Sequence, residues 1–348
     1  MLTWYIRLKI VKKVYELNKI NLAIFGATGL VGQKMKRILE ERNLNIDNIY
    51  FFASKNSAGK VIFFNSKEHF VEELCEKNIA NKKIDYALCA LDSPLAKEFL
   101  PLTKKYNITV IDNSSAFRMA DDIPLVVPEI NPEKALYEGN IIASPNCSTI
   151  QSVVALYPIY KNYGIKRIIY TTYQAVSGSG VNGIEDLKRG LWDGENRFYP
   201  HQIAYNVLPH IDDFLDDGYT KEEMKMVNET KKIFGDNSIK ITATTARVPV
   251  YDSHLVSINV ETEKPFELTD IFDIFKNEPG IILYDDVKNN IYPMPIVARG
   301  RNEVFVGRIR RDFSVENGIN FISVADNTRK GAALNTIQIL EYLIDKQK

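Results

Sequence analysis

The stretch Asn21-Leu-Ala-Ile-Phe25, followed by Gly26-Ala-Thr-Gly29-Leu-Val-Gly32, decides the expected fold of this chain. The first five residues form a short apolar run, which is typical of a buried strand. Residues 33–42 have apolar side chains at helical spacing and are expected to form a helix. A strand, a glycine-rich turn and a helix in this order bring backbone N–H groups to a pyrophosphate. The glycine spacing is GxxGxxG rather than GxGxxG, so a plain structural turn stays the alternative.

The end of the second expected strand, residues 48–53, indicates which dinucleotide binds. An NAD site usually places Asp or Glu here to hold the ribose 2′-hydroxyl. This chain offers no carboxylate at the position but hydroxyls, an amide and an ammonium group, on Ser54, Lys55, Asn56 and Ser57. These groups suit a 2′-phosphate, so the sequence favours NADP over NAD.

The alternation of strands and helices continues after this point. Further strands are expected at 84–90, 108–112, 125–127 and 141–143, and a helix at 94–106. This rhythm predicts an α/β fold with a Rossmann-type, doubly wound parallel sheet. Cys89 lies within an apolar run and is expected to be a buried small side chain, whereas Cys75 lies in a polar helical stretch.

Composition excludes several classes of protein. The chain has 348 residues, 45% of them hydrophobic, which predicts a globular protein of two domains. The formal net charge is zero, which argues against a nucleic-acid partner. No apolar run approaches the length of about 18 residues that a membrane helix needs. Three scattered cysteines exclude a disulfide framework and a cysteine-rich metal site, and indicate a cytoplasmic location with no bound metal.

The segment Ala143-Ser-Pro-Asn-Cys-Ser-Thr-Ile150 carries the candidate nucleophile. A strand is expected to end before Pro145, and a helix to run from here to about residue 163. Cys147 therefore falls at a helix N-terminus, where the helix dipole and free N–H groups favour a thiolate and can stabilise an oxyanion. A packed structural thiol is the alternative interpretation.

His254 is the candidate base for such a cysteine. It opens an expected strand in which one face is formed by His254, Val256, Ile258 and Val260. A satisfied core histidine would fit this pattern equally well. Arg247 lies just upstream, and its guanidinium can bind a carboxylate through two hydrogen bonds, which favours the functional interpretation. The other histidines are expected in solvated or loop positions: His69, His201 and His210.

Several motifs, in order from about residue 21 to the C-terminus, make the chain resemble the aspartate-semialdehyde dehydrogenase family. They are Gly26-Ala-Thr-Gly29-Leu-Val-Gly32, Asp112-Asn-Ser-Ser-Ala-Phe-Arg118, Val126-Val-Pro-Glu129, Ser144-Pro-Asn-Cys-Ser-Thr149, Thr172-Tyr-Gln-Ala-Val-Ser-Gly178, Glu222-Glu-Met-Lys225, Arg247-Val-Pro-Val250 with Ser253-His254, Phe305-Val-Gly-Arg-Ile-Arg310 and Asp326-Asn-Thr-Arg-Lys-Gly331. The whole series in order is highly specific, although each motif alone is not.

The resemblance implies NADPH-dependent reductive dephosphorylation of L-aspartyl 4-phosphate to L-aspartate 4-semialdehyde. The product serves biosynthesis of lysine and diaminopimelate, threonine, methionine and isoleucine. By this resemblance Cys147 is the nucleophile that forms a thioester, His254 the acid/base group and Gln174 the group that orients the acyl intermediate.

The resemblance also assigns substrate contacts. Arg247 matches the residue that holds the α-carboxylate, Arg118 and Lys225 the phosphate-binding pair, and Glu222 the acid that meets the substrate ammonium group. Glu222 and Lys225 are three residues apart on an expected helix, so they can share a face. Thr220-Lys-Glu-Glu223 is a capping box, which gives Glu223 a structural explanation.

The cofactor contacts that follow from the glycine turn, the loop after the second strand and the resemblance are Gly26, Thr28, Gly29, Leu30, Val31, Gly32, Ser54, Lys55, Asn56, Ser57, Ser177, Gly178 and Asn327. One departure concerns Asn56, because relatives tend to carry an arginine there that binds the 2′-phosphate. Lys55 is expected to compensate, and use of NAD as well stays open.

The second half of the chain is expected to form an α+β catalytic and dimerisation domain with a mixed, largely antiparallel sheet. Its strands are expected at 165–174, 239–248, 255–262, 304–311 and 319–325, and a last helix at 328–345. The resemblance implies that this helix returns to the nucleotide domain and that the protein is a homodimer. The expected division is an extension at 1–20, an NADP-binding domain at 21–147 and 328–348, and the second domain at 148–327.

Two rival functions stay open at this point. One is N-acetylglutamyl-phosphate reductase, which uses a similar fold and cysteine chemistry. Arg247, Glu222 and the sequence around Cys147 favour the aspartyl substrate, because its free ammonium group needs an acid. The other rival is a non-catalytic NADP-binding regulator, although such a protein would not need to keep Cys147 and His254.

Overall fold

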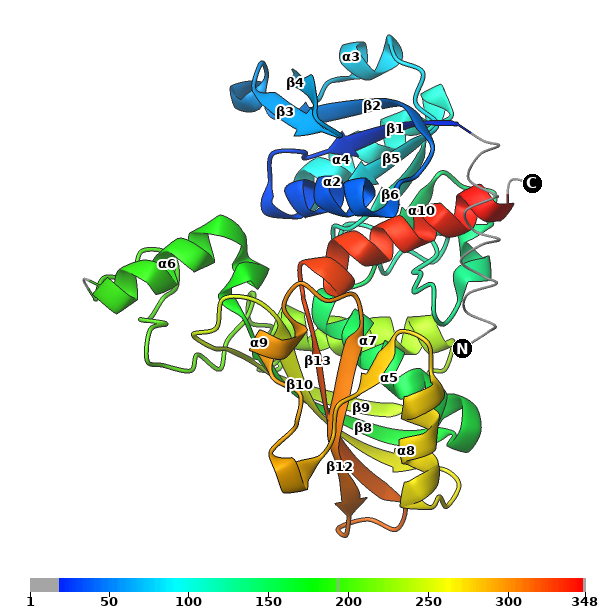
Figure 1. Ribbon diagram of the computed structural model, residues 1–348, viewed down its shortest axis with the longest axis vertical. Helices are drawn as coiled ribbons and strands as arrows, with labels where there is room; N and C mark the ends of the chain where they lie inside the picture. The colour runs from blue at the N-terminus through cyan, green and yellow to red at the C-terminus, as the bar shows by residue number, and fades with distance from the viewer. Residues whose placement is uncertain (1–18, 193, 347–348) are drawn as a thin grey trace. The chain divides into compact units, whose positions relative to one another are not determined.

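The computed structural model describes residues 19–192 and 194–346, which form two compact units (Figure 1). Of the described residues, the first unit comprises 19–128, Pro132–Ser144 and 333–346. The second comprises Glu129–Asn131 and Pro145–Ala332. Most of the expected extension at 1–20 lies outside the described residues.

The first unit contains a seven-stranded sheet in the order β3-β4-β2-β1-β5-β6-β7. All neighbouring strands are parallel except the β3–β4 hairpin, which is antiparallel, so the prediction of a doubly wound parallel sheet is confirmed. The strand bounds are β1 Ile20–Phe25, β2 Ile46–Ala53, β3 Val61–Phe64, β4 Lys67–Glu73, β5 Tyr86–Cys89, β6 Thr109–Asp112 and β7 Ile141–Ala143.

Helices cover both faces of this sheet because the central strand is buried on both sides. In β1, Leu22 and Ile24 belong to one apolar cluster with residues of α2 (Leu30–Arg42) and α10 (Leu334–Lys346). Ala23 and Phe25 belong to a second cluster with residues of α4 (Ser93–Phe99), of the following 3-10 turn Leu100–Tyr106 and of α3 (Glu76–Ala80). The continuous apolar run that predicted this strand therefore reflects two layers of helices.

Three details of the first unit differ from expectation. The helix expected at 94–106 changes to 3-10 geometry at Leu100, next to Pro101, which lacks the N–H needed to continue an α-helix. The strand expected at 125–127 is only an isolated bridge between Leu125 and Ala143. The β3–β4 hairpin was not anticipated, although Asn65 and Ser66 at its turn both have positive φ, as such hairpin turns require.

The expectation that His69 is solvated holds only in part, because its side chain is half-buried. It lies on β4, and its ring contacts Phe51 edge-on at a centroid distance of 5.4 Å. Burial, followed by the charge of Lys67, lowers its pKa. Of its charged neighbours, Glu68 lies on the other face of the strand, whereas Lys67 shares the face of His69.

The glycine turn between β1 and α2 has little space for side chains. Gly26 has a φ of +83°, and a Cβ there would lie 2.6 Å from the carbonyl oxygen of Ala90. A Cβ on Gly32 would lie 2.3 Å from the carbonyl oxygen of Gly26. A Cβ on Gly29 would meet that same oxygen only at 3.5 Å, an ordinary contact distance. Gly26 and Gly32 are therefore required by packing, whereas Gly29 is not.

The second unit contains a six-stranded sheet in the order β11-β12-β13-β10-β8-β9. Pairs β11–β12 and β8–β9 are parallel and the other three are antiparallel, which confirms the predicted mixed sheet. The strand bounds are β8 Ile165–Gln174, β9 Lys240–Arg247, β10 His254–Thr262, β11 Ile281–Leu283, β12 Val304–Asp312 and β13 Gly318–Ala325.

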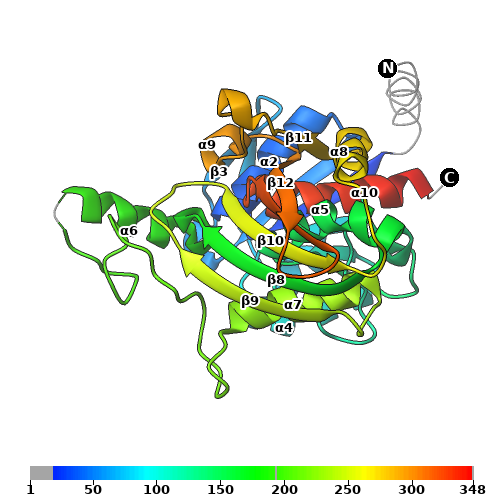
Figure 2. The ribbon, with the colours of Figure 1, turned by 90° about the horizontal axis from the view of Figure 1, so that it is seen from below.

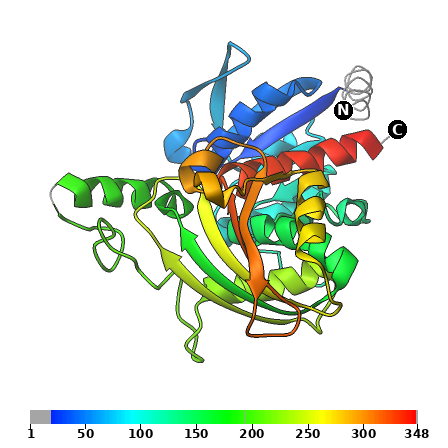
Figure 3. The ribbon, with the colours of Figure 1, turned by 60° about the horizontal axis from the view of Figure 1, so that its bottom comes forward.

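Helices α5 (Cys147–Tyr163), α7 (Lys221–Phe234) and α8 (Leu268–Asn277) cover one face of this sheet. On the opposite face, Ala298 and Val297 of the single-turn helix α9 (Pro295–Ala298) pack beside Phe305 and Val324, and none of the longer described helices covers the rest (Figures 2 and 3). Helix α6 (Gly180–Trp192) extends away from the sheet. The helix expected from residue 328 begins instead with a π-helical turn, Arg329–Ala333, before α10.

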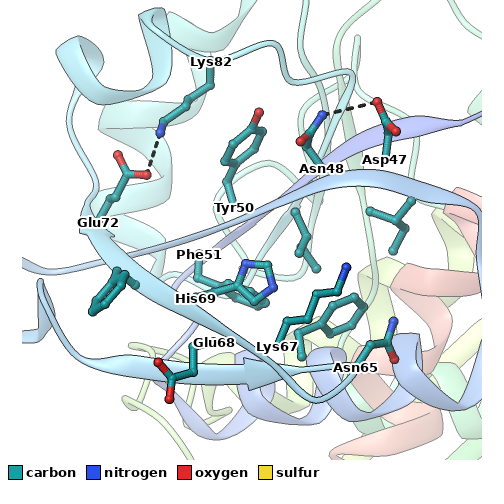
Figure 4. A pocket seen from close by; sticks show the side chains of 14 residues that line it. Asp47, Asn48, Tyr50, Phe51, Asn65, Lys67, Glu68, His69, Glu72 and Lys82 are labelled. Atoms are coloured by element: carbon teal, nitrogen blue, oxygen red, sulfur yellow. Dashed lines mark hydrogen bonds and ion pairs between the residues drawn. The ribbon is translucent and has the colours of Figure 1, made fainter.

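A pocket of about 490 Å³ lies in the first unit beside the early parts of β2 and β4 (Figure 4). Lys82 forms an ion pair with Glu72 across it and lies over the ring of Tyr50. Ligands of parallel α/β sheets bind outside the carboxyl ends of the strands, and the glycine turn follows the carboxyl end of β1. This pocket is therefore not the dinucleotide site.

Among the described residues, no helix has the length and apolar character that a membrane crossing requires. Within the same ranges, no three His, Cys, Asp or Glu side chains gather in a way that could hold a metal ion.

Replacement of Gly32 by alanine tests the packing of the glycine turn. We expect Gly32→Ala to lower the free energy of unfolding by about 1–3 kcal/mol, because the added methyl group overlaps the Gly26 carbonyl. Gly29→Ala is the matched control and should leave the stability nearly unchanged. Urea titrations followed by circular dichroism measure both. Equal stabilities of the two variants would contradict the packing argument.

Candidate active site

Cys147 is the first residue of α5, as its sequence context predicts. The N-cap residue Asn146 is extended, and its side chain makes no capping bond to the helix. The first N–H groups of a helix lack intrahelical partners, so this end favours negative charge beside Cys147. The Cys147 thiol donates a hydrogen bond to Asn146 Oδ1 with a distance of 3.6 Å. The cysteine is half-buried and is thus both held and accessible.

The π-helical turn before α10 packs directly on Cys147. A Cβ on Gly331 would lie 2.8 Å from Cys147 Cβ and 3.1 Å from its Cα. Single π-helical turns are frequent at functional sites. Gly331 lies in the last motif of the sequence, but the sequence alone did not connect it with Cys147.

The carboxylate of Glu222 joins three segments of the second unit. Its Oε1 accepts hydrogen bonds from Asn146 Nδ2 at 2.8 Å and from Gln174 Nε2 at 3.0 Å. Its Oε2 forms an ion pair with Lys225 Nζ at 3.3 Å. Lys225 also contacts Asp212 at 2.6 Å. The structure therefore brings Gln174, Glu222 and Lys225 together with Asn146, whose side chain could be expected from the sequence only to cap the helix.

Glu222 stays ionised despite its burial. Burial alone would raise its pKa, but Lys225 and the hydrogen bonds from Gln174 and Asn146 outweigh this effect and hold the pKa below the ordinary value of 4.5. Helix α7 presents this carboxylate because the predicted capping box of Thr220 and Glu223 is present at its start. Glu223 also accepts the backbone N–H of Thr245 on β9, which anchors the helix to the sheet.

The peptide groups of Ala175 hold both His254 and Arg247. The Ala175 N–H donates to His254 Nδ1 at 3.0 Å, and Arg247 Nη1 donates to the Ala175 carbonyl at 2.8 Å. Both side chains are buried. Burial, followed by the charge of Arg247, lowers the pKa of His254 well below its ordinary value, so the imidazole is neutral.

Two polar atoms of this pair lack a hydrogen-bond partner among the described residues. They are Arg247 Nε and His254 Nε2, and both are buried. A Cβ on Gly178 would lie 2.7 Å from Arg247 Nη1 and 3.3 Å from His254 Nε2. Glycine at this position therefore leaves the space in front of both groups open, and buried polar atoms without partners indicate a place for a ligand.

Asn327 connects Ser177 to the residue before His254. Its Oδ1 accepts the backbone N–H of Ser253 at 2.9 Å and the hydroxyl of Ser177 at 3.1 Å. Ser253 is buried and has a φ of +75°, a conformation that a non-glycine residue adopts only when its surroundings enforce it. The backbone at His254 is therefore tightly constrained.

The expected dinucleotide contacts of the first unit lie around two turns. Helix α2 begins at Leu30, and Gly29 before it has no side chain to cap the N–H groups of Leu30, Val31 and Gly32. Ser54 precedes the 3-10 turn Lys55–Ser57 at the end of β2. Thr28 donates to the Ser57 hydroxyl at 3.4 Å, which links the two turns.

Lys60 is a candidate that the sequence analysis missed. Its Nζ lies 3.4 Å from the hydroxyl of Ser57, and its side chain is exposed. Lys55 and Asn56 are exposed as well. The only signal in the sequence was a basic residue shortly after a turn, which is too common to be informative.

Arg118, the other expected phosphate ligand, is buried in the first unit. Its Nε donates to the carbonyl of Ser144 and its Nη2 to the carbonyl of Asn113, each at 2.9 Å. His201 and His210 lie in loops of the second unit, and the ring of His210 stacks on Phe214.

A Rossmann-type unit with a glycine turn, together with a unit that carries a helix-terminal cysteine and a buried histidine, defines a nicotinamide-nucleotide-dependent class of oxidoreductase. Family models agree with this division. Residues 21–136 match the NAD-binding domain of semialdehyde dehydrogenase, and residues 156–330 match its dimerisation domain.

Individual relatives identify the family. The chain is 52% identical to aspartate-semialdehyde dehydrogenase of Aquifex aeolicus over 332 residues, which cover 93% of this chain and 97% of that protein. The solved aspartate semialdehyde dehydrogenase II of Vibrio cholerae in complex with ASA has a TM-score of 0.90 at 44% identity, covering 94% and 98% of the two chains. The Candida albicans enzyme, solved with NADP, has a TM-score of 0.76 at 26% identity, covering 95% and 99%. The chain therefore belongs to the aspartate-semialdehyde dehydrogenase family, a family of oxidoreductases of amino-acid biosynthesis.

Replacement of Glu222 tests the carboxylate junction. We expect Glu222→Gln to lower the free energy of unfolding by about 1–3 kcal/mol near neutral pH, because an amide cannot satisfy three donors. The folded-state pKa of Glu222 is depressed, so its contribution is present above the ordinary value of 4.5 and is lost as the pH falls. The difference between the variant and the wild type should therefore shrink in acid.

A matched control for this substitution is Glu185→Gln. Glu185 forms an exposed ion pair with Lys188 at the same i,i+3 spacing. Its loss should change the stability by less than about 0.5 kcal/mol. Urea titrations at several pH values measure both variants. A constant difference across the acid range would contradict the role of the Glu222 charge.

Proposed function

We propose that this protein catalyses the NADPH-dependent reductive dephosphorylation of L-aspartyl 4-phosphate to L-aspartate 4-semialdehyde, with release of inorganic phosphate. The observation that carries the proposal is the position of Cys147, at the start of α5 and connected through Asn146 and Glu222 to Gln174. A thiolate in this position attacks the acyl phosphate, and phosphate leaves to give a thioester. Transfer of a hydride to the same carbon then gives the aldehyde and frees the thiolate.

The side chains near Cys147 support an amino-acid substrate. Arg247 has a buried Nε without a partner among the described residues, and a substrate α-carboxylate can accept this hydrogen bond. Glu222 is the ionised acid that binds the substrate ammonium group in this proposal. Gln174, which donates a hydrogen bond to the Glu222 carboxylate, orients the acyl group. Arg118 and Lys225 are the proposed phosphate ligands. The product is the proposed precursor of lysine, diaminopimelate, threonine, methionine and isoleucine.

The residues of the first unit fit a dinucleotide with a 2′-phosphate. The uncapped N–H groups at the start of α2 suit the pyrophosphate, because they are donors at the positive end of a helix dipole. Gly26, Gly29 and Gly32 keep the backbone there accessible. Lys55 and Lys60 supply positive charge beside the hydroxyls of Ser54 and Ser57, and residues 54–60 include no Asp or Glu. The bound nicotinamide would supply the hydride, and Ser177, Gly178 and Asn327 are the proposed contacts in the second unit.

Two further parts of the proposal concern assembly and location. A homodimer is supported by the match of residues 156–330 to a dimerisation domain and by the sheet face of the second unit that, among the described helices, carries only the single turn α9 (Figure 2). A reducing cytoplasm is supported by Cys75, Cys89 and Cys147, which form no disulfide.

Replacement of Cys147 tests the reaction. In a phosphate-dependent assay of aspartate-semialdehyde oxidation with NADP, we expect Cys147→Ser to lower turnover by about a thousandfold or more, because a hydroxyl is a much weaker nucleophile than a thiolate. Calorimetry should show unchanged NADP binding. Cys75→Ser, at the half-buried N-cap of α3, is the control with full activity.

Activity of Cys147→Ser close to that of the wild type would refute the thioester mechanism. Wild-type turnover with N-acetylglutamate semialdehyde, and none with aspartate semialdehyde, would instead identify the acetylglutamyl reductase. A folded protein that binds NADP but turns over neither aldehyde would be a non-catalytic regulator.

Lysine substitutions test the cofactor preference. We expect Lys55→Ala and Lys60→Ala each to weaken NADP binding by about tenfold or more while leaving NAD binding nearly unchanged, because an ion-paired hydrogen bond to the 2′-phosphate is lost. Lys67→Ala, on the same hairpin, is the control. Calorimetric titrations with NADP and NAD measure the difference. Equal losses for both nucleotides would place these lysines elsewhere on the cofactor, and no loss would exclude them from the site.

A further inference from the structure

Lys330 is a buried cation to which the proposed reaction gives no role. It belongs to the π-helical turn Arg329–Ala333, and only 1% of its side chain is exposed. Its Nζ donates to Glu129 Oε1 at 2.7 Å, a distance typical of a charge-assisted hydrogen bond. A buried ammonium group is costly unless it is paired in this way. The turn therefore cannot move away from Glu129 without a large loss of stability.

Glu129 is itself fixed beside helix α7. It belongs to the short segment Glu129–Asn131, which is part of the second unit although the residues before and after it are part of the first. Asn131 is buried, and its Nδ2 donates to the carbonyl of Ile233 near the end of α7 at 3.4 Å. The ion pair therefore holds the π-helical turn to the same helix whose two acids hold Asn146.

The start of the turn is fixed as well. The Asp326 carboxylate accepts the backbone N–H groups of Thr328 at 3.0 Å and of Arg329 at 2.9 Å. Arg329 Nε donates to Asn302 Oδ1 at 2.5 Å, and the N–H of Gly331 donates to the Asp326 carbonyl at 3.0 Å. Contacts from both ends of the turn thus hold the backbone of Gly331.

The position of this backbone matters because Gly331 packs on Cys147. A Cβ on Gly331 would lie 2.8 Å from Cys147 Cβ, so the glycine backbone closes one side of the cysteine side chain. Cys147 is thereby held between Asn146 and the π-helical turn, and both are tied to α7. We propose that the ion pair of Lys330 and Glu129 is a positioning element of the reaction, which holds the turn against Cys147 and keeps the sulfur at the start of α5. This inference rests on the proposed function and adds two residues to it.

The position of Cys147 Sγ affects two stages of the proposed reaction. The helix dipole and the first N–H groups of α5 act only over about one turn, so a sulfur that rotates away loses their stabilisation of the thiolate. Attack on the acyl phosphate also depends on the distance and angle between sulfur and carbon, and a displacement of about 1 Å can cost a hundredfold in rate. Lys330 and Glu129 act through Cys147 and do not contact the substrate in this proposal.

Two variants separate positioning from stability. Lys330→Met leaves Glu129 as a partly buried carboxylate without this cation, so we expect a lower urea midpoint. The double variant Glu129→Gln with Lys330→Met replaces both charges by neutral side chains of similar length, and its midpoint should return close to that of wild type. We expect kcat of the double variant to stay about tenfold or more below wild type, with KM changed by less than about twofold, because the turn is no longer held against Cys147.

Recovery of kcat together with the urea midpoint would show that the ion pair is only structural and would overturn the proposal. The matched control is the double variant Glu185→Gln with Lys188→Met, which removes an exposed ion pair of the second unit. Both its kcat and its urea midpoint should equal those of wild type. An equal loss of kcat in this control would mean that the effect is not specific to Lys330 and Glu129, and the proposal would fail.

Alkylation of Cys147 by iodoacetamide tests the position of the sulfur without the substrate. Mass spectrometry of the peptide that contains Cys147 gives the pH midpoint of the reaction. We expect this midpoint to rise by about half a unit or more in the double variant and in Gly331→Ala, which displaces the turn while keeping the ion pair, because the thiolate moves away from the helix start. An unchanged midpoint in both would overturn the proposal. Because this readout uses no substrate, failure of the proposed function alone would leave its result intact.

Discussion

The buried carboxylate of Glu222 is the interaction on which the geometry of the candidate site depends. It holds the start of α5 through Asn146, the end of β8 through Gln174 and the side chain of Lys225. A second acid of α7, Glu229, accepts the backbone N–H of Asn146 at 2.7 Å. An ionised carboxylate away from water is costly unless it is fully paired, so these donors have no favourable alternative arrangement. Helix α7 therefore fixes the position of Asn146, and with it the start of helix α5 at Cys147.

The surroundings of Cys147 and those of His254 have different electrostatic effects. The start of α5 and Lys225 favour negative charge, which suits a thiolate and a phosphate. Burial, followed by the charge of the Arg247 guanidinium, lowers the pKa of His254 and keeps it neutral, and both side chains are oriented by the single residue Ala175. Ala175 follows Gln174 directly, so the strand end that contacts Glu222 also places the histidine and the arginine. Gly178 and Gly331 contribute by having no side chains, since a Cβ on Gly178 would crowd Arg247 and His254 and a Cβ on Gly331 would collide with Cys147.

The sequence predicted best those elements whose local pattern and tertiary environment agree. The expected strand at 165–174 and the expected helix from Cys147 to about residue 163 have the bounds that the structure shows, because their apolar faces meet the same core along their whole length. The helix expected at 94–106 was wrong beyond Phe99, where apolar spacing continues but Pro101 interrupts the hydrogen bonds. The environment of His69 was predicted only in part, because charged neighbours along β4 say little about the side chain that packs on Phe51.

By itself, the sequence determined the glycine turn, the cysteine at a helix start, the capping box of Thr220 and Glu223 and the alternation that builds each sheet. These features depend on neighbours within a few residues, and local sterics and hydrogen bonding decide them. Only the tertiary structure decided that Asn146 and Gln174 share the Glu222 carboxylate, that Gly331 packs on Cys147, and that the peptide groups of Ala175 hold both His254 and Arg247. These contacts join residues that are distant along the chain, and a hydrogen-bond direction exists only once donor and acceptor meet.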